Sequence, residues 1–335
     1  MNDQNAKNSG RNPSTDPALM PQSMLKIGVS ACLLGKEVRF DGGHKRCSFV
    51  TDALAEHFEF VAWCPEVAIG MGTPRQPIRL VSDAGEIRAV GVRDAGLEVT
   101  LPLQRYGQSV AGSIGALSGF IFKKDSPSCG MERVKVYNDK GMAERSGTGL
   151  FAREIMKAHP LLPVEEEGRL NDANLRENFI NRVYVHARWQ ALQERGLSKS
   201  ALLDFHASHK LLVLAHSTVG YRELGRMLSN LGNVDLQSLG ERYIASLMDI
   251  LKTAATRKRH TNVLQHLLGY LKNRLSGPHL QDLVETIDAY RRGDYPLVVP
   301  VRMLQHHFLD KPHPYISQQV YLRPHPQALG VRNRV

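Results

Sequence analysis

Three cysteines in this sequence stand just after apolar runs that predict β-strands. Pro127 and Gly130 end one of these runs and force the chain into a turn. Because ligands bind beyond the carboxyl ends of strands in open α/β sheets, we expect the three thiols to meet at one site. The thiols and their runs are Cys32 after residues 25–29, Cys64 after residues 58–63 and Cys129 after residues 117–122.

Thiols in this arrangement point first to metal chemistry. Four cysteines in 335 residues are too few for a secreted disulfide scaffold, so we expect them to be free or metal-bound. Structural zinc sites use closely paired ligands, and Cys32 and Cys47 are the nearest pair here. A [4Fe–4S] cluster accepts dispersed thiolates, and with three of them keeps one iron open to a soft atom such as sulfur. The alternative, in which the cysteines are simply small buried apolar side chains, stays open.

The elements that would position these thiols alternate between strands and helices. This alternation predicts an α/β fold with a mostly parallel sheet. Besides the three strands, the sequence predicts a helix over 48–57, β-structure over 78–101, a helix over 103–117, a loop over 135–148, a helix over 149–158 and a short apolar piece over 161–164.

From Leu170 onward the apolar spacing becomes helical, which predicts a helical bundle. The expected helices cover residues 172–195, 200–216, 220–230, 241–256, 260–275 and 280–292, and an extended tail follows from Lys311. The predicted domains are a disordered tail over 1–23, an iron–sulfur domain over 24–165, a helical connector over 166–199 and a helical, basic domain over 200–335.

Charge is concentrated in the second half of the chain. The net charge is +10, and residues 201–335 carry 17 Lys and Arg against 10 Asp and Glu. Such an excess fits a polyanionic partner, although a solvated basic surface is an equal alternative. No apolar run approaches the ~20 residues of a membrane span, and residues 1–23 lack a signal-peptide core, so we expect a cytoplasmic protein with no membrane partner.

Several motifs resemble those of a known family. SACLLG, VRFDG, CPEVAIGMGTPR and KKDSPSCG resemble motifs of the thiouracil desulfidases. In the second half, HKLLVLAHS, HLLGYLKNRL and YPLVVPVRMLQHH resemble the DUF1722-type domain that is fused to this unit in tRNA 4-thiouridine desulfidases. The resemblance spans nearly everything from Leu25 to Pro326.

The resemblance implies a [4Fe–4S] cluster held by Cys32, Cys64 and Cys129. It also implies acid/base and hydrogen-bonding roles for Glu66 and Ser126 beside the cluster. Each role has a simpler alternative, because Glu66 could cap a helix and Ser126 could close its own turn. Cys47 fits none of the motifs and is predicted to be a bystander, and Asp41 is predicted to build the Asp-Gly-Gly turn.

The expected function is hydrolytic, non-redox removal of sulfur from 4-thiouridine in tRNA, which releases sulfide. Desulfidation of free thiouracil is an alternative within enzymes. An iron–sulfur RNA-binding regulator without turnover is an alternative of another class. The basic helical domain favours tRNA as the partner, because a small base needs no such surface.

Two groups in the second half are further candidates. His206, His209 and His216 share roughly one face of a predicted helix, which suggests either a metal site or, more simply, ordinary imidazoles. Arg257, Lys258 and Arg259 are consecutive cations that we predict to contact RNA phosphates.

Overall fold

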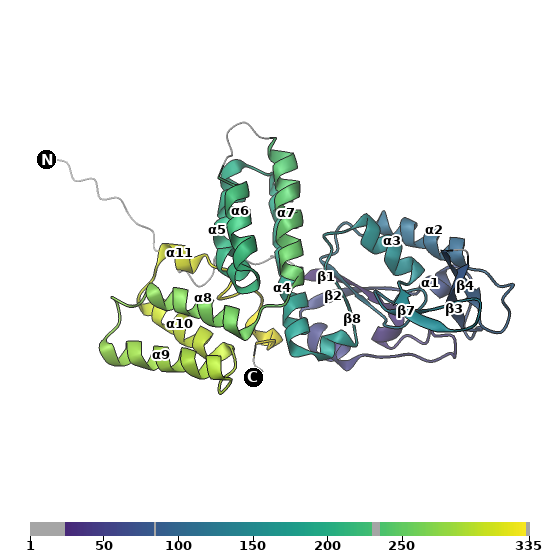
Figure 1. Ribbon diagram of the computed structural model, residues 1–335, viewed down its shortest axis with the longest axis horizontal. Helices are drawn as coiled ribbons and strands as arrows, with labels where there is room; N and C mark the ends of the chain where they lie inside the picture. Colours follow the sequence, from purple (N-terminus) through teal and green to yellow (C-terminus); the bar gives the residue numbers. More distant parts are fainter. Residues whose placement is uncertain (1–23, 84, 230–234, 333–335) are drawn as a thin grey trace.

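The computed structural model describes residues 24–83, 85–229 and 235–332. An α/β half and a helical half lie side by side, and the long helix α4 (Ala173–Arg195) stands between them (Figure 1). The predicted tail over 1–23 lies outside the described residues.

A parallel sheet forms the centre of the α/β half. Its order is β2-β1-β5-β8, and every neighbouring pair is parallel, which confirms the predicted mostly parallel sheet. In the middle strand, Ile27 lies opposite Phe60 on one side and Gly119 on the other. The carboxyl ends of the strands therefore share one edge. The strands are β1 (Leu25–Ser30), β2 (Phe58–Trp63), β5 (Gly119–Phe122) and β8 (Val164–Glu166).

Helices cover both faces of this sheet. On one face, α2 (Thr100–Ala111) and α3 (Leu150–Ala158) pack with Phe120 and Phe122 in an aromatic and aliphatic core. On the other face, α4 packs against the apolar side chains of β1. Burial on both faces explains why β1 is an almost continuous apolar run.

A second sheet has the order β4-β3-β6-β7. Its strands are β3 (Ile78–Asp83), β4 (Glu86–Gly91), β6 (Val134–Tyr137) and β7 (Ala143–Gly147). The predicted loop over 135–148 is therefore wrong. The strand β7 reads AERSG and is mostly exposed, so it has no apolar alternation that sequence analysis could detect.

The predicted β-structure over 78–101 holds for β3 and β4 but fails at its end. There, α2 begins at Thr100, whose Oγ1 accepts a hydrogen bond from the Ala89 amide, and only an isolated bridge joins Val90 to Glu98. A tertiary contact thus overrides local β-propensity.

The remaining short elements of the α/β half are η2 (Ala31–Leu34), η3 (Phe49–Leu54), α1 (Pro65–Ala68) and η4 (Arg169–Asn171). Of these, η3 is a π-helical turn that takes the place of the predicted helix over 48–57.

The helical half follows the predicted pattern closely. Side chains of Asp172, Ser198, Ser217, Asp235 and Thr256 accept hydrogen bonds from first-turn amides and so set the starts of α4 to α8. The helices after α4 are α5 (Lys199–His216), α6 (Thr218–Met227), α7 (Leu236–Lys252), α8 (Arg257–Gly269), α9 (Gly277–Arg292), α10 (Val298–Asp310) and α11 (Pro314–Ser317), and η5 (Gln327–Leu329) ends the series.

Helix α10 was not predicted, and the expected extended tail contains α11 and η5. The run before Arg302 is rich in β-branched residues and contains Pro300, so its local sequence does not indicate a helix. Pro300 lies in the first turn of α10, where its missing N–H needs no partner. Among the described residues, no helix combines the length and apolar character that crossing a membrane requires.

Helix α4 belongs to the cores of both halves. Its Phe179 and Val183 are buried with the parallel sheet, while Trp189 and Leu192 are buried with α5 and α7. The segment predicted as a connector thus packs along its length instead of bridging through solvent.

Candidate functional site

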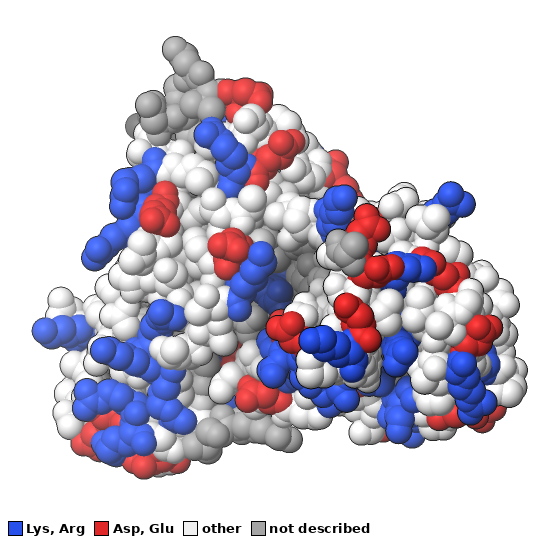
Figure 2. Space-filling view, turned by 45° about the vertical axis from the view of Figure 1, so that its right-hand side comes forward, with Lys and Arg blue, Asp and Glu red and all other residues white. Residues whose placement is uncertain are grey.

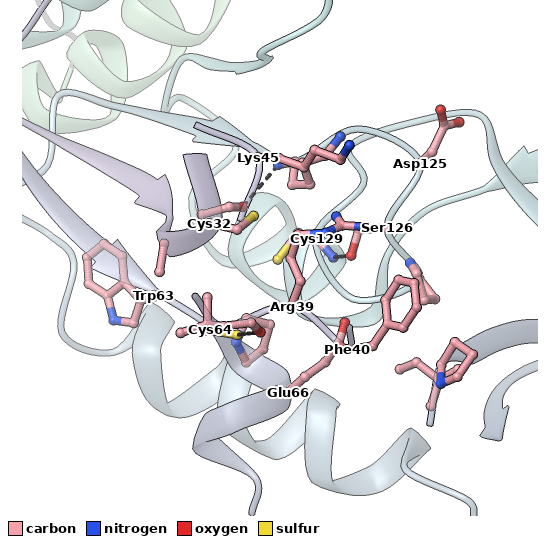
Figure 3. A pocket seen from close by; sticks show the side chains of 18 of the residues that line it. Cys32, Arg39, Phe40, Lys45, Trp63, Cys64, Glu66, Asp125, Ser126 and Cys129 are labelled. Atoms are coloured by element: carbon pink, nitrogen blue, oxygen red, sulfur yellow. Dashed lines mark hydrogen bonds between the residues drawn. The ribbon is translucent and has the colours of Figure 1, made fainter. Parts of the chain in front are cut away.

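A pocket of ≈ 350 Å³ opens at the carboxyl edge of the parallel sheet. Cys32, Cys64 and Cys129 all line it, so the structure brings the three predicted thiols together (Figure 3). Glu66 and Ser126 line the same pocket, as do Phe40 and Trp63. The other lining residues are Ser30, Ala31, Val38, Arg39, Lys45, Pro65, Arg75, Pro77, Ile78, Lys123, Lys124, Asp125 and Pro127.

Each thiol is held by a tight turn that follows a strand. Cys32 lies in η2, directly after β1, and Cys64 lies between β2 and α1. Cys129 lies in a turn that the Gly130 amide closes by donating to the Ser126 carbonyl over 2.8 Å. A Cβ at position 130 would stand 2.4 Å from a methyl of Val134, so this turn requires glycine.

The thiols are poor nucleophiles in this environment. Burial raises the pKa of Cys32 to about 11 and the pKa of Cys64 above its usual value, and it raises the pKa of Cys129 well above it. All three are therefore neutral thiols at pH 7 when nothing is bound. Metal binding displaces such protons and stabilises the thiolates, so the trio suits ligation better than covalent catalysis.

The donor set fits a multi-iron cluster. Among the residues that the structure describes, no three His, Cys, Asp or Glu side chains are grouped to hold one metal ion. A cubane cluster instead gives each thiolate a separate iron, so its ligands stand further apart around one cavity. Three convergent thiols in a ≈ 350 Å³ pocket match this requirement.

Glu66 is the acidic group that the structure positions most firmly beside the thiols. Its Oε2 accepts from Arg75 Nε at 2.9 Å and from Arg75 Nη2 at 2.7 Å. Its Oε1 accepts from the Ser128 hydroxyl at 2.7 Å. Glu66 and Arg75 are mostly buried, with exposed side-chain fractions of 16% and 5%. A carboxylate has about four acceptor sites, so Glu66 keeps capacity for one more partner in the pocket.

Arg75 and Ser128 are site residues that sequence reasoning missed. Arg75 also donates to the carbonyls of Gly72 and Val38, so it joins the loop after α1 to the loop after η2. Both residues lie within motifs quoted above, CPEVAIGMGTPR and KKDSPSCG, and membership of these motifs was the available signal. The contact of Ser128 with Glu66 arises only when segments 62 residues apart meet, whereas Arg75 lies nine residues after Glu66.

Ser126 closes its own turn. Its Oγ accepts from the Cys129 amide at 3.0 Å and from the Ser128 amide at 3.3 Å. Both bonds use the oxygen, so the hydroxyl hydrogen is not used in them. Ser126 thereby fixes the backbone that presents Cys129, and it also lines the pocket.

Comparison with known proteins finds family matches for both parts of the chain. A family model described as 2-thiouracil desulfurase matches residues 27–167, and a second one, described as a protein of unknown function (DUF1722), matches residues 210–326. "Uncharacterized protein YbgA" of Escherichia coli is 32% identical over 47% of this chain and 94% of its own length. "Uncharacterized protein YbbK" of Bacillus subtilis is 31% identical over 44% of this chain and 98% of its own length.

The chain belongs to the 2-thiouracil desulfurase family. It carries a DUF1722 domain behind the desulfurase domain. A solved structure titled "[4Fe-4S]-dependent thiouracil desulfidase TudS" shares 34% sequence identity, covering 44% of this chain and 93% of that chain, with a TM-score of 0.36.

Cys47 and Asp41, which the sequence analysis weighed as possible site residues, lie outside the pocket lining. Cys47 packs at the edge of the core beneath α4, and its amide donates to the Leu33 carbonyl. Asp41 Oδ1 accepts from the Gly43 amide at 3.1 Å, and Gly42 has a φ of +79°, so Asp41 builds the expected turn.

The three histidines predicted on one helix face, His206, His209 and His216, bond to different partners. His206 contacts the Tyr243 hydroxyl, His209 the Phe205 carbonyl and His216 the Thr253 carbonyl, each through Nδ1. Burial lowers their pKa values to about 4, about 3 and about 4 respectively. They are neutral core imidazoles with separate partners.

The predicted cations at the start of α8 are not equivalent. Arg257 lies over the Tyr290 ring at 5.3 Å and donates to the Tyr290 carbonyl at 2.8 Å, so it is part of the packing with α9. Lys258 is exposed and Arg259 half-buried. Neither forms an ion pair with a described acidic side chain, which leaves both charges available to a partner.

We expect the Glu66–Arg75 pair to matter for the stability of the desulfurase domain. Arg75→Met leaves a mostly buried carboxylate without its cation and should destabilise the fold by about 3 kcal/mol. Arg75→Met with Glu66→Gln should recover part of that loss, because no buried charge remains. Urea unfolding would measure both variants.

Arg46→Met is the matched control, because Arg46 pairs with Asp52 at the surface, where 52% and 55% of the two side chains are exposed. Its cost should stay below about 1 kcal/mol. Equal losses for Arg46→Met and Arg75→Met would contradict a special role for the buried pair.

Proposed function

We propose that this protein removes sulfur from 4-thiouridine in tRNA, in the cytoplasm, with a [4Fe–4S] cluster bound by Cys32, Cys64 and Cys129. In the overall reaction water supplies the oxygen that replaces sulfur on C4, and sulfide leaves. No electrons are exchanged between substrate and protein, so the proposed reaction is hydrolytic.

The observation that carries the proposal is the meeting of three soft ligands and one held carboxylate in a single pocket. Cys32, Cys64 and Cys129 come from three strand ends, and Glu66 lies among them on α1. The match to the 2-thiouracil desulfurase model covers all four positions. When bound, a three-thiolate cluster supplies an open iron, which is a Lewis acid with affinity for sulfur.

Glu66 is the group that moves protons in the proposed reaction. Its carboxylate accepts a proton from water as the water attacks C4, and it returns the proton to the ring nitrogen or the leaving sulfide. Arg75 donates to one oxygen of this carboxylate and Ser128 to the other, so the two hydrogen bonds fix the carboxylate in one orientation. We assign Arg75 and Ser128 to positioning, and Ser126 to holding the turn and donating its hydroxyl hydrogen to the base or the oxygen at C4.

The charge of the pocket supports a nucleotide within a polyanion over a free base. Five cations line the pocket against two acids, Glu66 and Asp125. The cations are Arg39, Lys45, Arg75, Lys123 and Lys124. Neutral thiouracil needs no such excess, whereas phosphates beside an extruded base do. Phe40, which is 38% exposed, adds an aromatic ring against which a base can stack.

The DUF1722 domain supplies further positive charge. Residues 201–335 carry a net charge of +7. Lys and Arg side chains occur on both halves of the face seen in Figure 2, with acidic side chains between them. Folded RNA is recognised largely through backbone and shape, so charge spread over both halves suits tRNA. Desulfidation of free thiouracil remains the alternative that the family description favours.

The first test concerns the cluster ligands. Anaerobically prepared protein should contain one oxygen-sensitive [4Fe–4S] cluster, and Cys32→Ala, Cys64→Ala or Cys129→Ala should each abolish it. Iron and sulfide analysis with absorption spectroscopy would measure occupancy. Cys47→Ala is the control and should keep both cluster and turnover, because Cys47 lies outside the pocket lining. Full occupancy in Cys129→Ala, or zinc in place of iron, would overturn the ligand assignment.

The second test separates proton transfer from ligation. Glu66→Gln should keep the cluster and lower turnover by about 10²–10⁴-fold, the usual contribution of a general acid/base. Ser128→Ala should also keep the cluster and lower kcat more than it raises KM, because it loosens the base without removing a binding group. Sulfide release and loss of 4-thiouridine absorbance report turnover. Near-normal turnover in Glu66→Gln would remove Glu66 from the mechanism, whereas absence of turnover in the native, cluster-loaded protein would favour a regulator without catalysis.

The third test concerns RNA. Lys258→Gln with Arg259→Gln should weaken tRNA binding and lower the slope of log affinity against log salt by about two units, since two phosphate contacts are lost. Turnover of free thiouracil or thiouridine should not change. Arg291→Gln with Arg292→Gln is the control, because these exposed cations already pair with Asp288 and Asp294. Unchanged tRNA affinity at every salt concentration would show that Lys258 and Arg259 are only solvated.

A further inference from the structure

A second cavity of ≈ 480 Å³ lies in the DUF1722 half, where α4, α8, α9 and the last described residues meet. It shares no lining residue with the three-cysteine pocket. Its lining consists of Ala173, Asn174, Glu177, Ala254, Ala255, Thr256, Arg257, His260, Tyr290, Tyr295, Pro296, Leu297, Val331 and Arg332. Neither the motifs nor the proposed desulfidation uses this cavity.

Arg332 supplies an unused hydrogen-bond donor in this lining. Its Nε donates to Glu177 at 2.7 Å and its Nη1 to the Tyr321 carbonyl at 2.7 Å, whereas its Nη2 has no hydrogen-bond partner among the described residues. Only 7% of Arg332 is exposed. A buried guanidinium N–H without an acceptor is unfavourable, so this atom is poised for a ligand that brings one.

Two helices begin at the same cavity. Thr256 caps α8, and Ala173 is the first residue of α4. Helix α8 has no acidic residue in its first turn, whereas the Asp172 side chain accepts hydrogen bonds from two first-turn amides of α4. The dipole makes the start of α8 partially positive, while the Asp172 carboxylate offsets the positive end of α4.

The charged side chains of the lining add to this positive character. Glu177 is the acid among the lining residues, and Arg332 pairs with it, which leaves the charge of Arg257 uncompensated in the cavity. Burial raises the pKa of Glu177, but the ion pair with Arg332 outweighs that effect and lowers the pKa overall, so Glu177 stays ionised. Burial lowers the pKa of His260 to about 3, so His260 contributes a neutral ring.

We propose that this cavity binds a phosphate group. Phosphate presents acceptor oxygens in several directions, and donors here come from Arg332, Arg257 and the start of α8. The phosphate belongs either to bound RNA or to a small nucleotide. Tyr295, which is 45% exposed at the rim, offers a ring for an attached base.

The test is titration calorimetry of the full chain with inorganic phosphate and with uridine 5′-monophosphate. Both probes should bind, and Arg257→Gln should weaken binding about tenfold or more, the effect of losing a charge-assisted hydrogen bond. Arg274→Gln is the matched control. Arg274 also donates to backbone carbonyls, those of Lys311 and Pro312, but lies outside the cavity lining.

Ala254→Glu is a second variant that keeps the test decisive if Arg257→Gln loosens the packing on Tyr290. It adds a carboxylate to the half-buried lining and should abolish phosphate binding while the thermal unfolding temperature stays near that of the native chain. Absence of binding by both probes would overturn the proposal. Equal losses in Arg257→Gln and Arg274→Gln would overturn it too, because they would indicate nonspecific attraction.

The probes also separate the two sources of phosphate. Tighter binding of uridine 5′-monophosphate than of phosphate identifies a nucleotide site. If excess tRNA displaces the bound monophosphate in native protein but not in Lys258→Gln with Arg259→Gln, the phosphate belongs to RNA. Turnover of free thiouridine by Arg257→Gln should equal that of native protein, so failure of desulfidation and failure of phosphate binding are distinguishable.

Discussion

The parallel pairing of β2, β1 and β5 is the constraint on which the rest of the site depends. Parallel strands point their carboxyl ends to one edge, so residues that follow each strand arrive at the same place whatever their separation in sequence. Cys32, Cys64 and Cys129 follow three such strands and therefore line one pocket. An antiparallel β1–β5 pair would send Cys129 to the opposite end of the sheet.

The pocket contains thiols and a carboxylate, and burying either kind of group without a partner is unfavourable. The buried Cys129 and the half-buried Cys32 and Cys64 are stable as neutral thiols or as metal ligands. The mostly buried Glu66 is stabilised by both Arg75 and Ser128 as partners. The partners come from the loop after α1 and the turn before Cys129, so the carboxylate ties the two loops together. The same hydrogen bonds thus shape the pocket and place its base.

Helix α4 makes the two halves one structure. The α4 side chains in the sheet core lie within residues 179–187 and those in the bundle core within residues 185–192, so neither core is complete without this helix. Its first turn also lines the cavity that contains Arg332. A ligand in that cavity would therefore contact the element that supports the desulfurase sheet, which gives the two sites a physical connection through one helix.

The sequence by itself determined the element types wherever periodicity was strong. The apolar runs at β1, β2 and β5 and the helical repeats from α4 to α9 are local patterns, and the motifs around Cys32, Cys64, Cys129 and Glu66 carry the family. Elements without such a pattern, β7 and α10, depend on contacts that local sequence does not encode. Only the tertiary structure showed that Ser128 and Arg75 hold Glu66, that the histidines are core residues and that Arg257 packs on Tyr290. The Ser128–Glu66 and Arg257–Tyr290 contacts join positions 62 and 33 residues apart in the chain, and side-chain spacing in sequence carries no record of such contacts.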